Sequence, residues 1–391
     1  MFNIKVVIGA NYGDEGKGQM TDYFCNQAIK KDENCLVVCA NGGAQRGHTV
    51  ITPEGIRHVF HHFGSGTLCG ADTYLPEHFI LNPIFFNQEL IELNKKGIKP
   101  KIYISNYCKV TTPFDMIVNQ LIEKSRGENR NGSCGAGIWE TELRYRTLLL
   151  FRYDCMSKDF LKSLRDIYFT QRLEKHGIYQ IPEEYADVWY SDQLIENYIE
   201  DFFRMLDYCE VVYDDKILRQ YQNIVFENGQ GLLLDCKYDK HATPSNTGLF
   251  NIDFLLDVLD REEMEVEVCY VTRSYMTRHG AGPFDTECVK EEIGLNIVEE
   301  TNVYNEFQGN FRYGKISVPS FLATIAQDYK KLVPTSKISL AVTHLNETGN
   351  KMIGTYRNFE PRILKPAFDK LYLSDGKTRD SIKIWSKKNE K

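Results

Sequence analysis

The segment from Val6 to Phe24 constrains the fold more than any other stretch of the chain. A β-branched apolar run from Ile4 to Ile8 predicts a buried strand, and the residues from Met20 onward have helical character. Between them lies a turn rich in glycine, with Gly9, Gly13, Gly16 and Gly18. A strand, a glycine turn and a helix in this order present backbone N–H groups and a helix N-terminus to phosphate. The sequence therefore predicts a phosphate-binding turn after the first strand of an α/β sheet.

The charged residues of this turn indicate more than phosphate binding. Lys17 adds a point charge for phosphoryl oxygens, but Gly18 and Gln19 follow it where the G-x-x-x-x-G-K-[ST] motif has serine or threonine. Asp14 and Glu15 place two carboxylates in an anion-binding turn, which weakens phosphate binding unless a metal ion or a proton transfer needs them. The plainer alternative is a glycine-rich surface turn.

Composition limits the class of protein. The 391 residues suffice for one large α/β domain or two ordinary ones, and 42% hydrophobic with 26% charged residues is a globular composition. The net charge of −7 argues against a general nucleic-acid binder, so a nucleotide has to be held by local positive potential. No signal peptide or membrane-length apolar run is visible, and we expect a cytoplasmic protein that does not bind membranes. Its eleven cysteines, with no C-x-x-C pair, predict buried free thiols.

The order of the predicted elements is strand-rich, with helices between the strands. We expect strands at Cys35 to Ala40, 223–228, 265–275 and 338–345, and a helix from Phe86 to Gly97. The region 156–221 is dense in charged and aromatic residues at helical spacing, which predicts a helical subdomain or a cap over the sheet. The sequence favours a single α/β domain over residues 1–391, with a mostly parallel central sheet and helical and loop insertions.

Six segments resemble motifs of the adenylosuccinate synthetase family, in the family's order. They are the G-D-E-G-K-G turn at 13–18, NGGAQRGHTV at 41–50, HVFHHFGSG at 58–66, FENGQGLLLD at 226–235, TPSNTG at 243–248 and TRHGAGPFDTE at 277–287. The resemblance covers nearly the whole chain and implies the family's fold, with a P-loop-like first strand, turn and helix. It also implies an enzyme that joins a nucleotide 6-oxo group to aspartate, using phosphoryl transfer from GTP and Mg²⁺.

The chemistry of this reaction assigns roles to the matching residues. The 6-oxo oxygen must become a leaving group, and phosphorylation achieves this if the N1 proton departs as O6 attacks the γ-phosphorus. Asp14 matches the base, and the resemblance implies that its carboxylate and the Gly47 carbonyl also bind Mg²⁺. His48 fits as the donor to the phosphoryl oxygen, since histidine changes charge near neutral pH. Gln230 can hydrogen-bond both the base and the nucleotide oxygen, and Lys17 completes the predicted catalytic set.

The nucleotide-binding residues follow from the resemblance position by position. They are Gly13, Glu15, Gly16, Gly18, Gln45, Gly47, Thr49, Ser133, Cys134, Thr243, Asn346, Ser374 and Gly376. The arginine of the family's T-T-G-R-G-I-G loop is missing at 133–139. Arg46, Arg144 or Arg146 could replace it on the monophosphate, and Arg144 or Arg146 could do so across a homodimer interface; ordinary surface arginines are the alternative.

Two further departures leave the substrates open. The family's T-K-L-D, whose aspartate accepts from guanine, reads Thr-His-Leu-Asn at 343–346, so Asn346 no longer demands guanine and ATP or dATP becomes as suitable as GTP. The amino-acid loop near 308–315 keeps two cations, Arg312 and Lys315, with Asn310 as a polar partner. They suit the two carboxylates of L-aspartate, although another amine donor stays open.

IMP is the expected acceptor among purine nucleoside monophosphates, and dGMP or GMP is the alternative. Relatives that act on dGMP lose the aspartate of the turn, which this chain keeps as Asp14. A non-catalytic purine-nucleotide-binding protein is the alternative of another class. The joint presence of Asp14, Lys17, His48 and Gln230 favours the enzyme.

Overall fold

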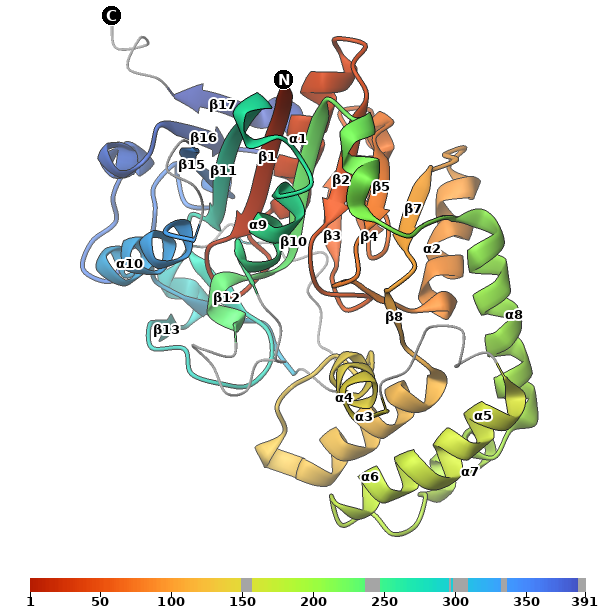
Figure 1. Cartoon of the computed structure of the whole chain (residues 1–391). Coiled ribbons are helices and arrows are strands. Elements are labelled where there is room, and N and C mark those ends of the chain that lie inside the picture. Colours follow the sequence, from red (N-terminus) through yellow and green to blue (C-terminus); the bar gives the residue numbers. More distant parts are fainter. Residues whose placement is uncertain (149–156, 236–246, 295–296, 298–308, 332–335, 386–391) are drawn as a thin grey trace, which may run out of the picture.

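The computed structural model describes residues 1–148, 157–235, 247–294, 297, 309–331 and 336–385 (Figure 1). In this part of the chain the main sheet has ten strands, in the order β17-β16-β15-β11-β1-β10-β2-β5-β7-β9. Neighbouring strands are parallel except β16 and β17. Their bounds are β1 (Phe2–Gly9), β2 (Cys35–Cys39), β5 (Asp72–Leu75), β7 (Ile102–Ser105), β9 (Glu210–Val212), β10 (Asn223–Gly231), β11 (Met264–Arg273), β15 (Lys337–Thr343), β16 (Lys370–Ser374) and β17 (Ile382–Trp385). The expected mostly parallel α/β sheet is confirmed.

The first strand lies inside this sheet, as its apolar sequence requires. Ile4, Val6 and Ile8 belong to one hydrophobic cluster and Val7 to another, because successive side chains of a strand point to opposite faces. Burial on both faces explains a continuous apolar run rather than an alternating one. Helix α1 (Lys17–Ile29) follows the glycine turn and contributes Met20, Phe24 and Cys25 to the cluster that holds Val7.

The register of the central strands brings their carboxyl ends together. Gly9, the last residue of β1, lies opposite Gly231 of β10 and Val271 of β11. The segments that follow these three strands therefore emerge side by side at one edge of the sheet. In parallel α/β sheets this edge is where ligands bind.

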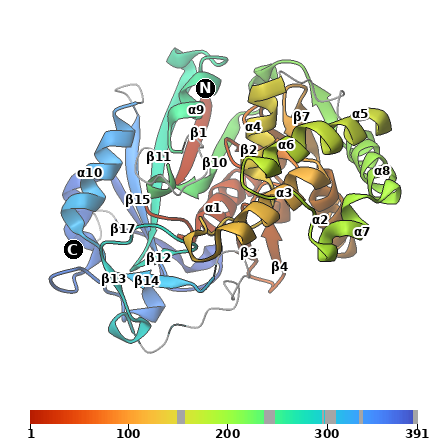
Figure 2. The ribbon, with the colours of Figure 1, turned by 90° about the horizontal axis from the view of Figure 1, so that it is seen from below.

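The helices gather mainly beside the β7 end of the sheet. Figure 2 shows α3 to α8 on one side of the molecule and α10 with strands β12 to β14 on the other, with α1 between them. The helices are α2 (Pro83–Lys95), α3 (Pro113–Arg126), α4 (Ile138–Leu148), α5 (Lys158–Ser163), α6 (Thr170–Glu174), α7 (Glu183–Trp189), α8 (Asp192–Tyr208), α9 (Phe250–Leu256) and α10 (Val318–Tyr329). None of the helices in the described ranges is both long and apolar enough to cross a membrane.

The region 156–221 contains the expected helices α5 to α8, joined in part by a π-helical turn at Leu164–Phe169. They share a hydrophobic cluster with α2 and α3, in which Phe86, Trp189 and Phe202 are buried. The region also contributes β9 to the edge of the main sheet, a strand that the sequence pattern did not predict. That these helices form a subdomain remains a prediction.

Three small sheets complete the fold. β3 (His48–Ile51) pairs with β4 (Arg57–Phe60), and β6 (Ile80–Leu81) pairs with β8 (Lys109–Val110). β12 (Met276–Arg278), β14 (Arg312–Gly314) and β13 (Glu287–Cys288) form the third, in that order. β3 matters for the site because it carries His48 to the N-terminus of α1, where α1 packs against it.

Candidate active site

The turn between β1 and α1 adopts the conformation that an anion-binding turn needs. Gly13, Asp14 and Gly16 have φ angles of 103°, 59° and 91°, in the left-handed region. Glycine adopts this region freely, whereas Asp14 is one of the few residue types that tolerate it. Gly16 precedes the first residue of α1, and no side chain caps this end of the helix. Backbone N–H groups at the start of α1 are thus left for a ligand.

The buried side chain of Glu15 stabilises the turn. Its Oε1 accepts from the backbone N–H groups of Asn11 (3.1 Å) and Gly13 (2.8 Å), and its Oε2 lies 2.6 Å from Nζ of Lys17. Burial alone would raise the pKa of this carboxyl, but Lys17 and the backbone N–H groups hold it below its ordinary value. A Cβ on Gly231 would come within 2.6 Å of Oε1, so the glycine leaves room for this carboxylate. The side chain of Glu15 therefore stabilises the turn from within the protein. A bound nucleotide would contact the backbone of Glu15 instead of its carboxylate.

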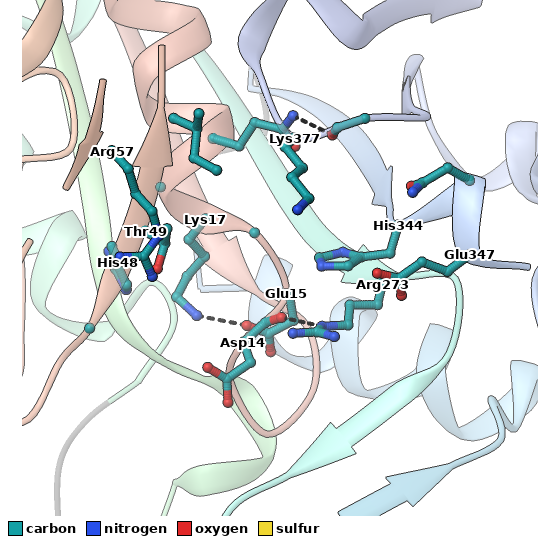
Figure 3. Close-up of a pocket in the computed structure, with 17 residues that line it drawn as sticks. Asp14, Glu15, Lys17, His48, Thr49, Arg57, Arg273, His344, Glu347 and Lys377 are labelled. Atoms are coloured by element: carbon teal, nitrogen blue, oxygen red, sulfur yellow. Dashed lines mark hydrogen bonds and ion pairs between the residues drawn. The ribbon is translucent and has the colours of Figure 1, made fainter. Parts of the chain in front are cut away.

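Asp14 lines a pocket that the turn shares with β3 (Figure 3). Its side chain is 24% exposed, and Oδ2 lies 3.5 Å from Nε2 of His279. The Asp14 carbonyl accepts from Nε of Arg273 (2.6 Å), which fixes the turn to the end of β11. Lys17, Gly18, Gly47, His48 and Thr49 line the same pocket. The structure thus brings together Asp14, Lys17 and His48 from the predicted catalytic set.

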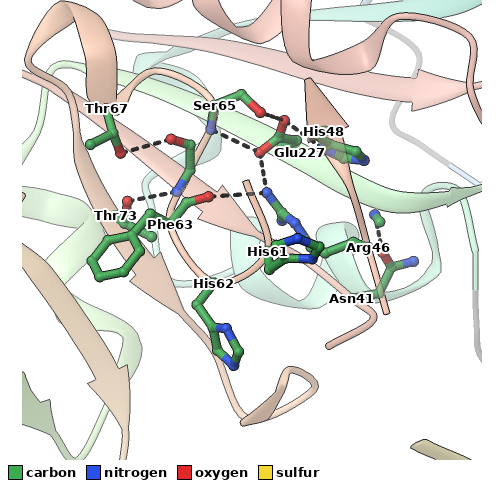
Figure 4. Close-up of polar contacts among 12 residues, drawn as sticks. Asn41, Arg46, His48, His61, His62, Phe63, Ser65, Thr67, Thr73 and Glu227 are labelled. Atoms are coloured by element: carbon green, nitrogen blue, oxygen red, sulfur yellow. Dashed lines mark hydrogen bonds and ion pairs between the residues drawn. The ribbon is translucent and has the colours of Figure 1, made fainter. Parts of the chain in front are cut away.

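His48 is held by a buried carboxylate on β10 (Figure 4). Its Nδ1 lies 2.7 Å from Oε1 of Glu227, and Oε2 of Glu227 lies 2.7 Å from Nη2 of Arg46. Burial lowers the pKa of His48 to about 4 despite this carboxylate. Burial alone would raise the pKa of Glu227, but Arg46 and His48 hold it below its ordinary range. His48 is therefore a neutral imidazole at neutral pH.

Two glutamines of the predicted site lie beside these groups in the chain. The side-chain amide of Gln45 is buried, and neither of its polar atoms has a hydrogen-bond partner in the part of the chain that the structure describes. A buried amide without partners is costly, so this one suits a ligand contact. Gln230 is half-buried near the end of β10, where Gly229 N–H donates to Oδ1 of Asn41 (2.7 Å).

The other end of the pocket is built from the ends of β11 and β15. Asn346 and Gly376 line it as expected, together with His344, Glu347 and Lys377. Ser374 is different, because its hydroxyl is buried and donates to Oε1 of Gln19 (3.2 Å) rather than lining the pocket.

Sequence reasoning missed several pocket residues. They are Arg57, Arg273, His344, Glu347 and Lys377. Arg273 Nη1 donates to the Tyr275 hydroxyl (2.8 Å), which donates to Oε2 of Glu347 (2.6 Å). Arg273 and His344 could have been found from their place at the carboxyl ends of predicted strands, where α/β proteins bind ligands.

Comparison with known proteins decides which family has this site. The family model of adenylosuccinate synthetase matches residues 6–314. The chain belongs to the adenylosuccinate synthetase family. It is therefore a C–N-forming ligase driven by a nucleoside triphosphate, and the non-catalytic alternative is set aside.

Relatives and solved structures agree with this assignment. Adenylosuccinate synthetase of Pasteurella multocida is 29% identical over 331 residues, covering 78% of this chain and 70% of the relative. The Lactobacillus acidophilus enzyme is 30% identical over 318 residues, with the same coverage. The fully ligated adenylosuccinate synthetase of Plasmodium falciparum has a TM-score of 0.70 at 15% identity, covering 98% of this chain and 100% of that one.

A second structural neighbour comes from a virus. Succinoaminodeoxyadenylate synthetase of cyanophage S-2L, bound to dGMP and to dATP as an energy donor, has a TM-score of 0.60 at 14% identity. The match covers 98% of this chain and 95% of that one. At this identity both structures support the fold alone.

The structure places Arg144 inside the scaffold, which corrects its expected phosphate role. Its side chain is fully buried, and Nε and Nη2 donate to Oδ1 (3.0 Å) and Oδ2 (2.8 Å) of Asp115. Nη2 also donates to the Val110 carbonyl (2.7 Å). This guanidinium is engaged by Asp115 and Val110, and Arg144 does not line the pocket that holds Asp14. Arg146 is exposed on α4 and pairs with Glu142 (2.7 Å), outside the pocket.

Replacing Arg144 with methionine should lower the free energy of unfolding by ~3–5 kcal/mol, because it leaves the Asp115 carboxylate buried without its cation. Urea unfolding followed by circular dichroism measures this change. Arg146→Met is the control, since its exposed pair with Glu142 should contribute at most ~0.5 kcal/mol. Equal losses in the two variants would contradict the structural role of Arg144.

Other predicted residues lie outside the pocket or outside the described residues. The Ser133 hydroxyl exchanges hydrogen bonds with Asn119 (2.9 and 3.0 Å), and the half-buried Cys134 follows it. Neither lines the pocket that holds Asp14. Thr243 falls in 236–246, outside the described residues.

The predicted amino-acid loop is partly engaged in ion pairs. Arg312 lies on β14, with Nε 2.8 Å from Oε1 of Glu287 and Nη1 donating to the carbonyls of Gly280 (3.1 Å) and Gly282 (3.0 Å). Lys315 Nζ is 2.5 Å from Oε2 of Glu292. Asn310 is exposed. None of these three predicted residues lines the pocket, so an amino acid would have to bind beside it.

Proposed function

We propose that the protein joins L-aspartate to the 6-oxo carbon of IMP, through a 6-phosphoryl intermediate formed from GTP or ATP. The observation that carries this proposal is the placement of Asp14, Lys17 and His48 around one pocket at the N-terminus of α1. A base, a cation and an imidazole meet there beside free backbone N–H groups. These are the groups that phosphoryl transfer to a deprotonated oxygen needs.

The first half of the reaction activates the 6-oxo group. Asp14 accepts the N1 proton of the acceptor base while O6 attacks the γ-phosphorus and the nucleoside diphosphate leaves. Lys17 and the N-terminus of α1 stabilise the negative charge of the transferring phosphoryl group. In the second half the aspartate amine attacks C6, the C6–O bond breaks, and phosphate leaves with O6. The attacking neutral amine loses one proton to solvent as the C6–N bond forms, and the product nitrogen keeps one hydrogen.

His48 has the geometry of a proton donor to the phosphoryl oxygens. Glu227 accepts from Nδ1, so Nε2 is the atom that can meet a substrate. Burial keeps the imidazole neutral at neutral pH, but bound phosphates would favour its charged form because opposite charges raise the pKa of a histidine. With the phosphates bound, Nε2 would thus carry a proton and could donate it to a phosphoryl oxygen.

The residues of the pocket fit Mg²⁺. Asp14 and Gly47 line the same pocket, and a carboxylate and a backbone carbonyl are the hard oxygen ligands that Mg²⁺ prefers. Mg²⁺ commonly takes one or two protein oxygens and completes its shell with phosphate and water. When bound, Mg²⁺ would neutralise charge on the triphosphate.

The donor base would occupy the end of the pocket lined by His344, Asn346 and Glu347. An amide at 346 both donates and accepts, so we expect GTP to have no large advantage over ATP in kcat/KM. Asn346→Asp should move the preference toward GTP by about tenfold or more, because a carboxylate accepts from guanine N–H groups and offers adenine N1 no donor. Steady-state kinetics with both donors measures this. A strong GTP preference of the wild type would refute the expectation, and Glu347→Gln would then test whether the neighbouring carboxylate reads guanine.

The second substrate would bind near β14. Arg312→Leu should raise the KM for aspartate by about tenfold or more, because it removes the cation offered to a carboxylate, and should leave the KM of the triphosphate nearly unchanged. Arg312 also holds the Gly280 and Gly282 carbonyls, so the matched control is Glu287→Gln, which removes its ion pair but keeps the guanidinium. An equal rise in the KM of all three substrates would indicate that Arg312 only supports the loop.

A substrate screen tests the function as a whole. It crosses IMP, GMP and dGMP with ATP, dATP and GTP, with and without aspartate, and measures phosphate release and the nucleotide product. The proposal predicts that aspartate-dependent phosphate release is largest with IMP. The retained Asp14 supports IMP over dGMP, the acceptor bound to the cyanophage S-2L enzyme. Release without aspartate dependence in every pairing would exclude aspartate as the amine donor. A homodimer, expected from the family, is testable by sedimentation.

A further inference from the structure

Arg46 is a buried cation close to the catalytic pocket in the chain. In the segment NGGAQRGHTV, Arg46 stands two residues before His48. The Arg46 side chain is completely buried. A buried guanidinium is costly unless a carboxylate and further hydrogen bonds accompany it. Arg46 therefore has to be understood together with its partners.

Its main partner is the carboxylate that also holds the catalytic imidazole. Nη2 of Arg46 lies 2.7 Å from Oε2 of Glu227 and 3.3 Å from the carbonyl oxygen of Phe63. Oε1 of Glu227 lies 2.7 Å from Nδ1 of His48. The Ser65 backbone N–H donates to Oε2 (3.2 Å), and its hydroxyl donates to Oε1. Figure 4 shows that the Glu227 carboxylate lies between Arg46 and His48 and contacts both.

This arrangement fixes which nitrogen of His48 meets the substrate. With Nδ1 bonded to Glu227, Nε2 has no hydrogen-bond partner among the described residues, and His48 lines the phosphate pocket. An imidazole keeps this orientation only as long as its carboxylate stays in place. Arg46 holds the other carboxylate oxygen, Oε2, and Ser65 donates to both oxygens of Glu227.

We propose that Arg46 is a positioning residue for the phosphoryl-transfer step: it holds Glu227 so that His48 keeps its proton on Nδ1 and directs Nε2 at the phosphoryl group. This inference rests on the proposed function for its kinetic consequence only, because the orientation of the imidazole is measurable without turnover. Arg46 touches no reacting atom, so its loss should slow the chemical step rather than weaken substrate binding.

The experiment compares Arg46→Met and Arg46→Lys with Arg144→Met. Arg144 is the matched control because it is an equally buried guanidinium paired with a carboxylate, but away from the pocket. Arg46→Met should lower kcat about tenfold or more with each KM changed less than about threefold. Arg46→Lys should recover most of kcat because it keeps a cation for Glu227. Arg144→Met should keep the kcat of the folded enzyme.

The second readout is the ¹⁵N spectrum of the imidazole of His48 in labelled protein, assigned by its disappearance in His48→Asn. The wild type and Arg144→Met should show a proton on Nδ1 and none on Nε2, whereas Arg46→Met should show a mixture of tautomers. An unchanged imidazole spectrum in Arg46→Met, or a kcat that falls no more than in Arg144→Met, overturns the proposal. If Arg46→Met does not fold, Arg46→Ala takes its place with the same expected outcomes. If the wild type forms no product, the proposed function fails, while the spectrum still decides the role of Arg46.

Discussion

Replacing Asp14 with asparagine is expected to lower turnover by ~10²-fold or more, with much smaller changes in substrate affinity. Asparagine has nearly the same shape, but it cannot accept the N1 proton of the acceptor base. It also tolerates the left-handed conformation that Asp14 adopts at φ 59°, so the turn should keep its structure. Steady-state kinetics together with thermal unfolding separates the loss of the base from a loss of folding.

The control for this experiment is Glu15→Gln, since Glu15 is the other carboxylate of the turn and lies buried under it. We expect Glu15→Gln to destabilise the turn and to reduce binding of the triphosphate, because the pair with Lys17 is lost. Asp14→Asn should therefore lower mainly turnover, whereas Glu15→Gln should lower stability and triphosphate binding. An Asp14→Asn enzyme with near-normal turnover would remove Asp14 from the role of base.

Replacing His48 with asparagine should also lower kcat by ~10²-fold, the range of a general acid. The amide nitrogen of asparagine can occupy the place of Nδ1 and donate to Glu227, while the atom corresponding to Nε2 is absent. The variant thus deletes the proton donor and keeps the contact with β10. Binding of the triphosphate, measured by calorimetry, should change far less than kcat.

A histidine away from the pocket provides the comparison. His176 lies after α6 and outside the pocket, so His176→Asn should have wild-type kinetics. If His48→Asn retains kcat within a few-fold of this control, the phosphoryl group receives its proton from another source.

The sequence predicts the local parts of this site well, because local patterns encode them. The apolar run from Ile4 to Ile8 is the inner part of β1, and two of the glycines that follow, Gly13 and Gly16, take the left-handed conformations that the turn needs. The helix begins at Lys17, three residues before the first residue with helical character, because Gly16 ends the turn directly at the helix N-terminus. The first strand, turn and helix are therefore confirmed.

The side chains that interact over long distances in the chain could not be predicted. Nothing near Arg144 indicates that it pairs with Asp115, 29 positions away, because the contact depends on how α4 packs against α3. Arg273, His344 and Lys377 come from three separate strand ends, and only the order β16-β15-β11-β1 brings them to one pocket. The sequence pattern predicted Asn346 and Gly376 at this end of the pocket, but it did not predict that Arg273, His344 and Lys377 lie beside them.

Glu227 illustrates the same limit within a recognised motif. The motif around 226–235 predicted a contact from Gln230, yet the residue that holds His48 is Glu227, on a strand 179 positions further along the chain. A buried charge in a strand was the available signal, because an unpaired carboxylate in a core is rarely tolerated.

Transfer of an oxygen label from the acceptor to phosphate tests the central claim most directly. The acceptor nucleotide is prepared with ¹⁸O at the 6-oxo position and incubated with the triphosphate, Mg²⁺ and aspartate, and the released phosphate is analysed by mass spectrometry. Activation by phosphoryl transfer to O6 predicts one ¹⁸O atom in the phosphate for each C–N bond formed, and no transfer in Asp14→Asn beyond its residual turnover. Product formed with unlabelled phosphate would contradict the account, because O6 would then have left the purine without being phosphorylated.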